Sequence, residues 1–207
     1  MPDLKLEKAL HSRGLRIVAG VDEAGRGPLA GPVSAAAVIL PLRYRCPGLD
    51  DSKKLSPVKR ESLHARLTTD PKVTWAVALA DVEEIDSINI LRATHLAMRR
   101  AVEQLRVAID HCLIDGLPVP AFPWSHDGVV KGDGLSLSIA AASVIAKVTR
   151  DRWMHQASHE FPHYGFERHQ GYGTPEHLAA LRTHGPCRIH RRSFRPVSQL
   201  TLPLGEA

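Results

Sequence analysis

The chain has 207 residues, of which 43% are hydrophobic and 24% are charged, so it can bury a core as one domain and does not have the composition of a disordered chain. Its formal net charge of +5 favours a polyanionic partner such as nucleic acid. No apolar run approaches the roughly 18 residues of a membrane span, and three scattered cysteines exclude a disulfide framework and a CxxC zinc site, so we expect a cytoplasmic protein.

The first half of the chain predicts three strands and one helix. Residues 16–21 read as a strand that runs into a turn rich in glycine and proline, and the apolar residues 32–40 read as a second strand, buried on both faces. These two strands are expected to form a hairpin. Ser56 as N-cap and Pro57 at the first helical position begin a helix that ends near Thr68, and residues 73–79 read as a third strand.

The second half predicts longer helices. Residues 86–106 read as one helix, residues 112–114 and 128–131 as short strands, and residues 135–157 as a long helix with one buried stripe. Thr174 and Pro175 begin a further helix that runs to Thr183, and the last ten residues look irregular. Strands mixed with helices indicate an α/β domain, with a central mixed β-sheet flanked by helices and a C-terminal helical extension.

Four acidic residues stand at the ends of predicted strands. Asp22 and Glu23 follow the first strand, Asp115 ends a later one, and Asp133 lies between a short strand and the long helix. Carboxylates at one sheet edge suit hard cations such as Mg²⁺ and Mn²⁺, and two ions about 3.5–4 Å apart can clamp a phosphodiester. Strand alternation would send Asp22 and Glu23 to opposite faces, so the following turn is expected to bend. Each acid alone also fits a turn former or a helix cap.

The segment Gly25-Arg26-Gly27 follows the two adjacent acids after a single alanine. Glycines allow close backbone approach to a ligand, exposed N–H groups can bind an anion, and Arg26 can add a bidentate phosphate contact. The GxGxxG spacing of a dinucleotide site and the Walker A pattern are both missing. A flexible hairpin with no ligand is the alternative for this tripeptide.

Taken in order, several motifs resemble the type 2 ribonuclease H family, ribonuclease HII. They cover roughly residues 16–196 and comprise residues 20–32 (GVDEAGRGPLAGP), 51–55 (DSKKL), 115–116 (DG), 131–133 (KGD), 139–151 (IAAASVIAKVTRD), 171–174 (GYGT) and 190–194 (HRRSF). Each motif alone is weak, whereas the ordered set is specific.

This resemblance implies a ribonuclease H-like fold and a metal-dependent endoribonuclease. It implies cleavage of RNA within RNA–DNA hybrids and 5′ of single ribonucleotides embedded in duplex DNA, as in ribonucleotide excision repair, with 5′-phosphate and 3′-hydroxyl products. By family pattern Asp22, Glu23, Asp115 and Asp133 are the catalytic and metal-binding carboxylates, and up to two Mn²⁺ or Mg²⁺ ions bind with substrate.

The resemblance also implies substrate contacts. The backbone of Gly25, Arg26 and Gly27 would read the 2′-hydroxyl, and Tyr172 would pack on the sugar after the cut site. Contacts to the substrate are also expected from residues on polar or basic stretches, each of which could equally be a solvated surface: Lys53, Ser143, Lys147, Arg191 and Arg192. The twelve histidines are scattered without a zinc pattern, and we assign them no role.

Domain organisation and partners complete the expectations. Residues 1–186 are expected to form the catalytic domain with its C-terminal helices, and residues 187–207 a basic segment and tail. The tail beyond Pro196 has no aromatic pair of the kind that docks a sliding clamp, and a monomer is expected. Two other functions stay open: a resolvase-like DNA nuclease on the same fold, and a non-catalytic nucleic-acid-binding module, which would predict a lost carboxylate.

Overall fold

A five-stranded mixed sheet lies at the centre of the computed structural model, which describes residues 1–200. Its order is β3-β2-β1-β4-β5, and the strands are β1 (Val18–Ala24), β2 (Val33–Ile39), β3 (Thr74–Ala80), β4 (His111–Asp115) and β5 (His126–Val129). β1 and β2 form the expected antiparallel hairpin, β3 continues it antiparallel, and β4 and β5 add parallel pairs. The predicted mixed sheet is therefore confirmed.

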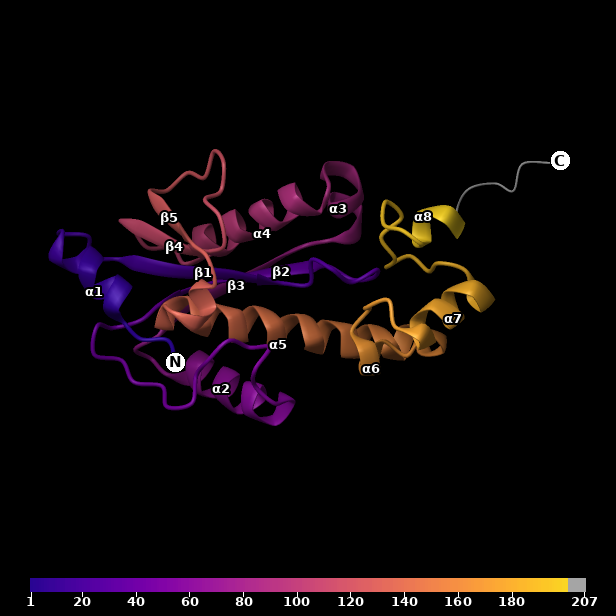
Figure 1. Ribbon diagram of the computed structural model, residues 1–207, viewed down its shortest axis with the longest axis horizontal. Coiled ribbons are helices and arrows are strands. Elements are labelled where there is room, and N and C mark those ends of the chain that lie inside the picture. The colour runs from indigo at the N-terminus through magenta and orange to yellow at the C-terminus, as the bar shows by residue number, and fades with distance from the viewer. Residues whose placement is uncertain (201–207) are drawn as a thin grey trace.

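Helices cover both faces of this sheet. They are α1 (Lys5–Ser12), α2 (Pro57–Thr69), α3 (Val82–Ile88), α4 (Ile90–Gln104), α5 (Leu137–Glu160), α6 (Phe166–His169), α7 (Pro175–His184) and α8 (Val197–Leu200), with 3₁₀ turns at Gly132–Gly134 and Pro162–Tyr164. Figure 1 shows α3 and α4 on one side of the sheet, α2 and α5 on the other, and α6 to α8 beyond one end, which confirms the C-terminal helical extension. No helix within residues 1–200 is long and apolar enough to cross a bilayer.

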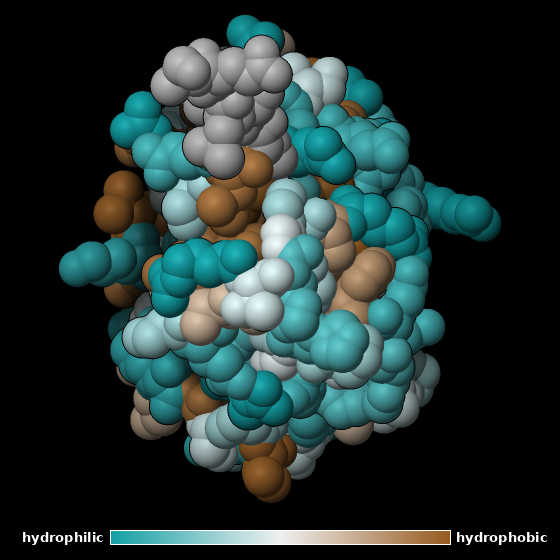
Figure 2. Space-filling model, turned by 90° about the vertical axis from the view of Figure 1, so that its right-hand side faces the viewer, coloured by the Kyte–Doolittle hydropathy of each residue, from teal (hydrophilic) through white to brown (hydrophobic). Residues whose placement is uncertain are grey.

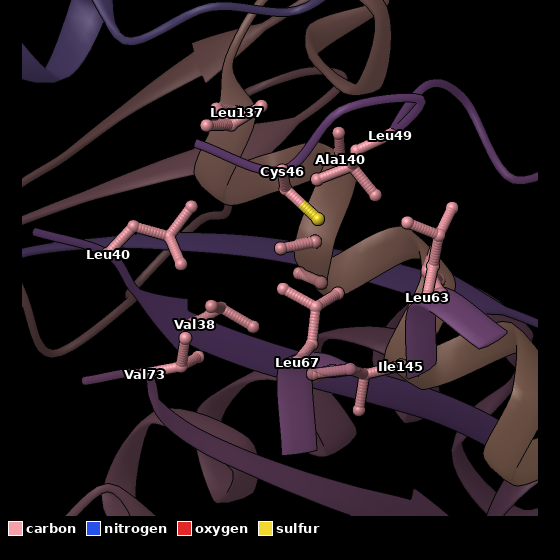
Figure 3. Close-up of a cluster of buried hydrophobic side chains, with 14 of the residues drawn as sticks. Val38, Leu40, Cys46, Leu49, Leu63, Leu67, Val73, Leu137, Ala140 and Ile145 are labelled. Carbon is pink, nitrogen blue, oxygen red and sulfur yellow. The ribbon is translucent and has the colours of Figure 1, made fainter. Parts of the chain in front are cut away.

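The alternation of small residues along β2 divides the core into two layers. Ala36 and Val38 belong to the cluster shared with α2 and α5, whereas Ala35 and Ala37 belong to the cluster shared with α4. In the first layer, side chains from the sheet, α2, α5 and residues 40–49 converge on Leu67 and Ile145 (Figure 3). Small strand residues let the helices approach the backbone closely. At Gly20 an added Cβ would lie 2.3 Å from the main chain of Ser138, so α5 packs directly on β1.

The first half of α5 is buried on all sides, from Leu137 to Ala146, where the sequence predicted one buried stripe. The difference arises because α5 lies between the sheet, α2 and α1, so no face of its first turns meets water. Ser136 caps the helix, as its side chain accepts the N–H of Ile139. The buried carboxylate of Glu7, on α1, accepts the Ser138 N–H at 3.0 Å and so binds α1 to the start of α5.

Several predicted boundaries are wrong, and backbone conformation explains two of them. The expected helix 86–106 is two helices, because Asn89 adopts φ 68° between them and α3 begins earlier, after the capping box of Asp81 and Glu84. The expected strand 128–131 lies at His126–Val129, because Lys131 also adopts a positive φ, of 58°. β1 continues beyond residue 21, with consequences for the acids described below.

The two ends of the chain also differ from expectation. Helix α1 was not predicted, because its short charged sequence gains its stability from Leu4, Leu10 and Glu7 packed against distant residues. The last ten residues were expected to be irregular, yet Val197–Leu200 forms one helical turn. Residues 201–207 of the predicted tail lie outside the described residues. The predicted boundary at 186/187 stays a prediction, although Ile189 and Val197 share an apolar cluster with Leu29 and Met154 of the longer segment.

Candidate active site

Three carboxylates from distant parts of the chain meet at one edge of the sheet. β1 and β4 are parallel neighbours with Val21 opposite Ile114, so Asp22 and Asp115 follow the last pair side by side. The 3₁₀ turn after β5 brings in Asp133. Each of these three residues offers an oxygen within 4.8 Å of the other two, an arrangement that can hold a metal ion. The predicted convergence of these three acids is found.

Hydrogen bonds fix the carboxylate of Asp115 between the strand and the turn. It accepts the N–H of Gly132 at 2.7 Å and, more weakly, the N–H of Asp133 at 3.4 Å. A Cβ at Gly132 would lie 2.6 Å from the end of the Ile139 side chain and 3.3 Å from the Asp115 carboxylate, so the glycine lets this turn lie close to both. The short motif Gly132-Asp133-Gly134 thereby positions two acids at once.

The cluster concentrates negative charge in a buried place. Burial raises the pKa of Asp22 well above its usual value, the charges of Glu23 and Asp115 raise it further, and a hydrogen bond from Ser143 opposes both. Burial likewise raises the pKa of Asp133, with the charge of Asp115 adding to it. Such repulsion between oxygen ligands is relieved when a divalent cation binds, so the donor set fits a hard metal ion.

Glu23 lies on the opposite face of β1 from Asp22. Both acids are within the strand, paired with Ala36 and Ala35. The chain bends only after them, at residues 26–27, so strand alternation still separates their side chains. Glu23 bonds to Arg26 at 3.3 Å and lines a cleft of about 390 Å³ under α4 that also reaches Asp115. Burial raises the pKa of Glu23, while Arg26 lowers it. Its oxygens are not part of the three-acid cluster.

The loop before α2 brings a cation and another acid to the cluster. Burial acts to lower the pKa of Lys53, but the carboxylates of Asp22, Asp133, Asp51 and Asp115 outweigh it and raise the pKa. Asp51 hydrogen-bonds to Asp133, an interaction not anticipated although the motif DSKKL contains this residue. The hydroxyl of the predicted site residue Ser143 bonds to Ser52 at 2.9 Å beneath this loop.

Two buried arginines support the segment of residues 25–32, which begins with Gly25-Arg26-Gly27, here called the glycine-arginine loop. Arg150 donates to the carbonyls of Pro32 and Ala30, each at 2.9 Å. Arg191 donates to Gly31 at 3.0 Å and Arg26 at 2.8 Å. Burial lowers the pKa of Arg150 to about 10 and that of Arg191 to about 9, with Arg150 also lowering the latter.

This arrangement corrects the expectation that Arg191 contacts substrate. Its side chain is 0% exposed and its donors are taken by loop carbonyls, so it supports the loop from inside. Lys147 does not lie on a fully solvated face of α5 either: it pairs with Asp151 at 2.7 Å, outside the carboxylate cluster, and Arg150, one turn further along, is buried. Arg192 is exposed, and Asp86 accepts its backbone N–H at 2.8 Å.

Tyr172 stands beside the loop. Its side chain is half-exposed, and its ring lies 3.6 Å from where a Cβ at Gly27 would be. The ring of Tyr172 and the backbone of Gly27 therefore border the same surface, and the substrate contacts expected of them stay a prediction.

A hydrogen-bonded pair of buried histidines, His177 and His190, holds the backbone of Tyr172; from the sequence no role was expected of them. The N–H of Cys187 donates to Nδ1 of His190, so Nε2 of His190 carries the proton and donates to His177 at 2.9 Å. His177 then donates from Nδ1 to the Tyr172 carbonyl, at 2.9 Å. Only the three-dimensional contact reveals this pair, because the histidines are thirteen residues apart.

Comparison with known proteins agrees with this geometry. The family model described as "Ribonuclease HII" matches residues 19–197. The chain is 53% identical over 197 residues to the ribonuclease HII of Geobacillus thermodenitrificans (strain NG80-2), covering 95% of this chain and 75% of that protein. It is 55% identical over 204 residues to that of Myxococcus xanthus (strain DK1622), covering 98% and 69%.

Solved structures share the fold. Ribonuclease H2 from Pyrococcus horikoshii OT3 matches with a TM-score of 0.71 and 25% identity, over 89% of this chain and 96% of that one. The structure of the PCNA:RNase HII complex from Archaeoglobus fulgidus matches with a TM-score of 0.73 and 24% identity, over 86% and 95%. Bst-RNase HIII, solved in complex with Mn²⁺, matches with a TM-score of 0.70 and 18% identity, over 93% and 71%.

Proposed function

The chain belongs to the ribonuclease HII family and is a metal-dependent endoribonuclease, and on this premise we propose that it cuts the RNA strand of RNA–DNA hybrids and duplex DNA 5′ of an embedded ribonucleotide. The observation that carries the proposal is the meeting of Asp22, Asp115 and Asp133 at one sheet edge. The Gly25-Arg26-Gly27 loop begins three residues after Asp22 and is supported by the buried Arg191.

The three clustered carboxylates would hold a divalent cation. When bound, such a cation supplies an activated water and stabilises the departing 3′-oxygen, and a second one can join with substrate. Asp115 keeps its geometry through the Gly132 N–H, and Asp22 through Ser143, so the ligands are oriented before any ion arrives. Glu23 stays a proposed ligand that would act from the α4 face of β1, through the cleft that it shares with Asp115.

Recognition of the ribose would come from backbone and ring together. The 2′-hydroxyl is the group that distinguishes one ribonucleotide from its deoxy neighbours, and N–H groups of residues 25–27 can bond to it. Tyr172 offers a flat surface on which the next sugar can pack. Lys53, close to the acids, would bind the adjacent phosphate, while Lys147 and Arg192 stay proposed contacts to the backbone.

The remaining expectations belong to the same proposal. We propose Mn²⁺ or Mg²⁺ as the cation, a monomer in the cytoplasm, and a role in removing ribonucleotides from DNA. The Archaeoglobus relative was solved in complex with PCNA, but the sequence beyond Pro196 here has no aromatic pair, so we propose no clamp contact through this segment. Residues 201–207 of this segment lie outside the described residues.

One gel tests the proposal. A duplex with one ribonucleotide should be cut in Mn²⁺ or Mg²⁺ and not in chelator, and an all-DNA duplex should stay intact. Asp115→Asn should abolish cleavage with an unchanged melting temperature, whereas Glu83→Gln, an exposed acid on α3, should cut normally. Cleavage of the all-DNA duplex would favour the resolvase-like alternative, and an active Asp115→Asn variant would refute the assigned site.

A further inference from the structure

A large open cleft lies between α1 and the segment that follows β2, apart from the three-acid cluster. Its volume is about 1000 Å³, and its lining includes the basic residues Lys8, His11, Arg16, Arg43 and Arg45. We name it the α1 cleft. Leu137, the first residue of α5, also lines it, so the cleft ends against the helix that follows the proposed metal ligand Asp133.

The charge of the α1 cleft is unbalanced. Lys8, Arg16, Arg43 and Arg45 are exposed, and none of them takes part in a salt bridge within residues 1–200. Asp3, the one acid in the lining, pairs with Lys5 at 3.0 Å.

Several other surface arginines have acidic partners. Arg152 pairs with Glu61, and Arg188 pairs with Glu160. Figure 2 shows the end of the molecule that carries α7 and α8. The part of it that the grey atoms leave visible is mostly hydrophilic, with small separate apolar patches. A cleft with several uncompensated cations instead focuses a positive potential, which attracts polyanions.

Main-chain hydrogen bonds attach the wall of this cleft to the start of α5, which limits its distance from the carboxylates. Asp3 donates its N–H to Leu135 at 3.0 Å and accepts the N–H of Leu137 at 2.8 Å. Leu137 is four residues from Asp133, so the two are at most about 14 Å apart even for an extended chain. Successive phosphates of one DNA strand are spaced by about 3.4 Å along the axis, so the cleft begins within roughly four base-pair steps of the cut.

We propose that the α1 cleft binds the sugar–phosphate backbone of one arm of the duplex, beginning within about four base pairs of the scissile phosphate. This inference rests on the proposed function for the identity of the polyanion. The contact is independent of sequence, because cations on flexible stems read phosphate charge and not base edges. It lengthens the footprint of the enzyme beyond the glycine-arginine loop.

Binding to an all-DNA duplex of 24 base pairs in chelator tests the contact without any catalysis. The double variant Arg43→Gln/Arg45→Gln should bind roughly tenfold more weakly, and its slope of log K against log salt should fall by about two, because each arginine neutralises one phosphate. The matched double variant Arg99→Gln/Arg106→Gln removes the same charge from α4 and the residues after it, on the other side of the sheet, and should keep the wild-type slope.

Two further measurements, with duplexes of different arm length and with a small phosphate ligand, test whether the α1 cleft contacts a duplex arm or binds a nucleotide. Cleavage of duplexes with one arm shortened to about one base pair, too short to enter the cleft, should be equal for wild type and the Arg43/Arg45 variant, while full-length arms should show the difference. An unchanged salt slope in a folded variant would overturn the proposal. The proposal would also be overturned if adenosine monophosphate bound the wild type but not the Arg43/Arg45 variant while both proteins bound the duplex with the same affinity. Since the duplex holds no ribonucleotide, a failed cleavage prediction leaves this measurement valid.

Discussion

Alanine at Gly27 and alanine at Gly25 should have opposite effects on stability, although the two positions are two residues apart. At Gly27 an added Cβ meets only the ring of Tyr172, at 3.6 Å, which is ordinary contact, and its φ is not in the left-handed region. At Gly25, φ is +96°, and the Cβ would lie 2.0 Å from Nε of the buried Arg150.

The expected magnitudes follow from these contacts. Gly25→Ala carries about 1–2 kcal/mol for the left-handed backbone and about 1–3 kcal/mol for overpacking against Arg150, hence about 2–5 kcal/mol in all. A chain of this size loses about 2–4 °C in melting temperature per kcal/mol, so the loss is about 4–20 °C. Gly27→Ala should gain about 0.4–1 kcal/mol, because alanine restricts the unfolded chain.

Activity should fall at Gly27 for a reason unrelated to stability. The Cβ at Gly27 occupies the surface between the loop and Tyr172 on which the ribose is proposed to lie, so kcat/KM for a single embedded ribonucleotide should fall about 10²-fold without loss of stability. Thermal unfolding and steady-state cleavage of one labelled duplex measure both quantities. Wild-type kcat/KM for Gly27→Ala, or a melting temperature lowered as far as that of Gly25→Ala, would refute the reasoning.

Three further predictions concern stability, pH and sugar contact. Glu7→Gln should lower the free energy of unfolding by about 1–3 kcal/mol in urea titrations, because the carboxylate accepts from Ser136 and Ser138, and an unchanged midpoint would contradict this. Burial, and then the charge of a neighbouring histidine, lowers the pKa of His190 to about 4, so the unfolded chain binds more protons between pH 6.5 and 4. Up to about 3 kcal/mol, present above pH 6.5, should be lost as pH falls through that window, and His190→Gln should remove this slope; an identical slope in the variant would refute it. Tyr172→Ala should raise KM for duplexes with a ribonucleotide by about tenfold, corresponding to about 1.4 kcal/mol of lost sugar contact, while the melting temperature stays constant because the side chain is half-exposed; an unchanged KM would exclude the sugar contact.

Local patterns in the sequence predicted those elements whose signals are local. Ser56 and Pro57, and later Thr174 and Pro175, mark helix starts that the structure confirms, since an N-cap hydroxyl and a proline act on the next turn alone. The sequence did not predict the break at Asn89 or helix α1. The break lies at the left-handed backbone of Asn89, which no residue type in the pattern demanded, whereas α1 depends on contacts with distant residues, such as that of Glu7 with Ser138, 131 residues away.

The acids illustrate the same division at the candidate site. Family resemblance named Asp22, Glu23, Asp115 and Asp133 together, but strand alternation carries Glu23 to the opposite face of β1 and leaves three acids in the cluster. Arg191 belongs to a basic run that resembles a solvated DNA contact, yet its guanidinium is buried beneath the glycine-arginine loop. Charge can be read from a sequence, whereas burial depends on what packs around it.

Residue chemistry and periods of a few residues specify the amino-acid types of the site, their order along the chain and the alternation that makes a mixed sheet between helices. The packing of the folded chain determines which carboxylates meet, which arginines face inward, and how His177 and His190 support Tyr172. Those relations are set by strand order and by helix packing across more than a hundred residues, and no local period in the sequence encodes them.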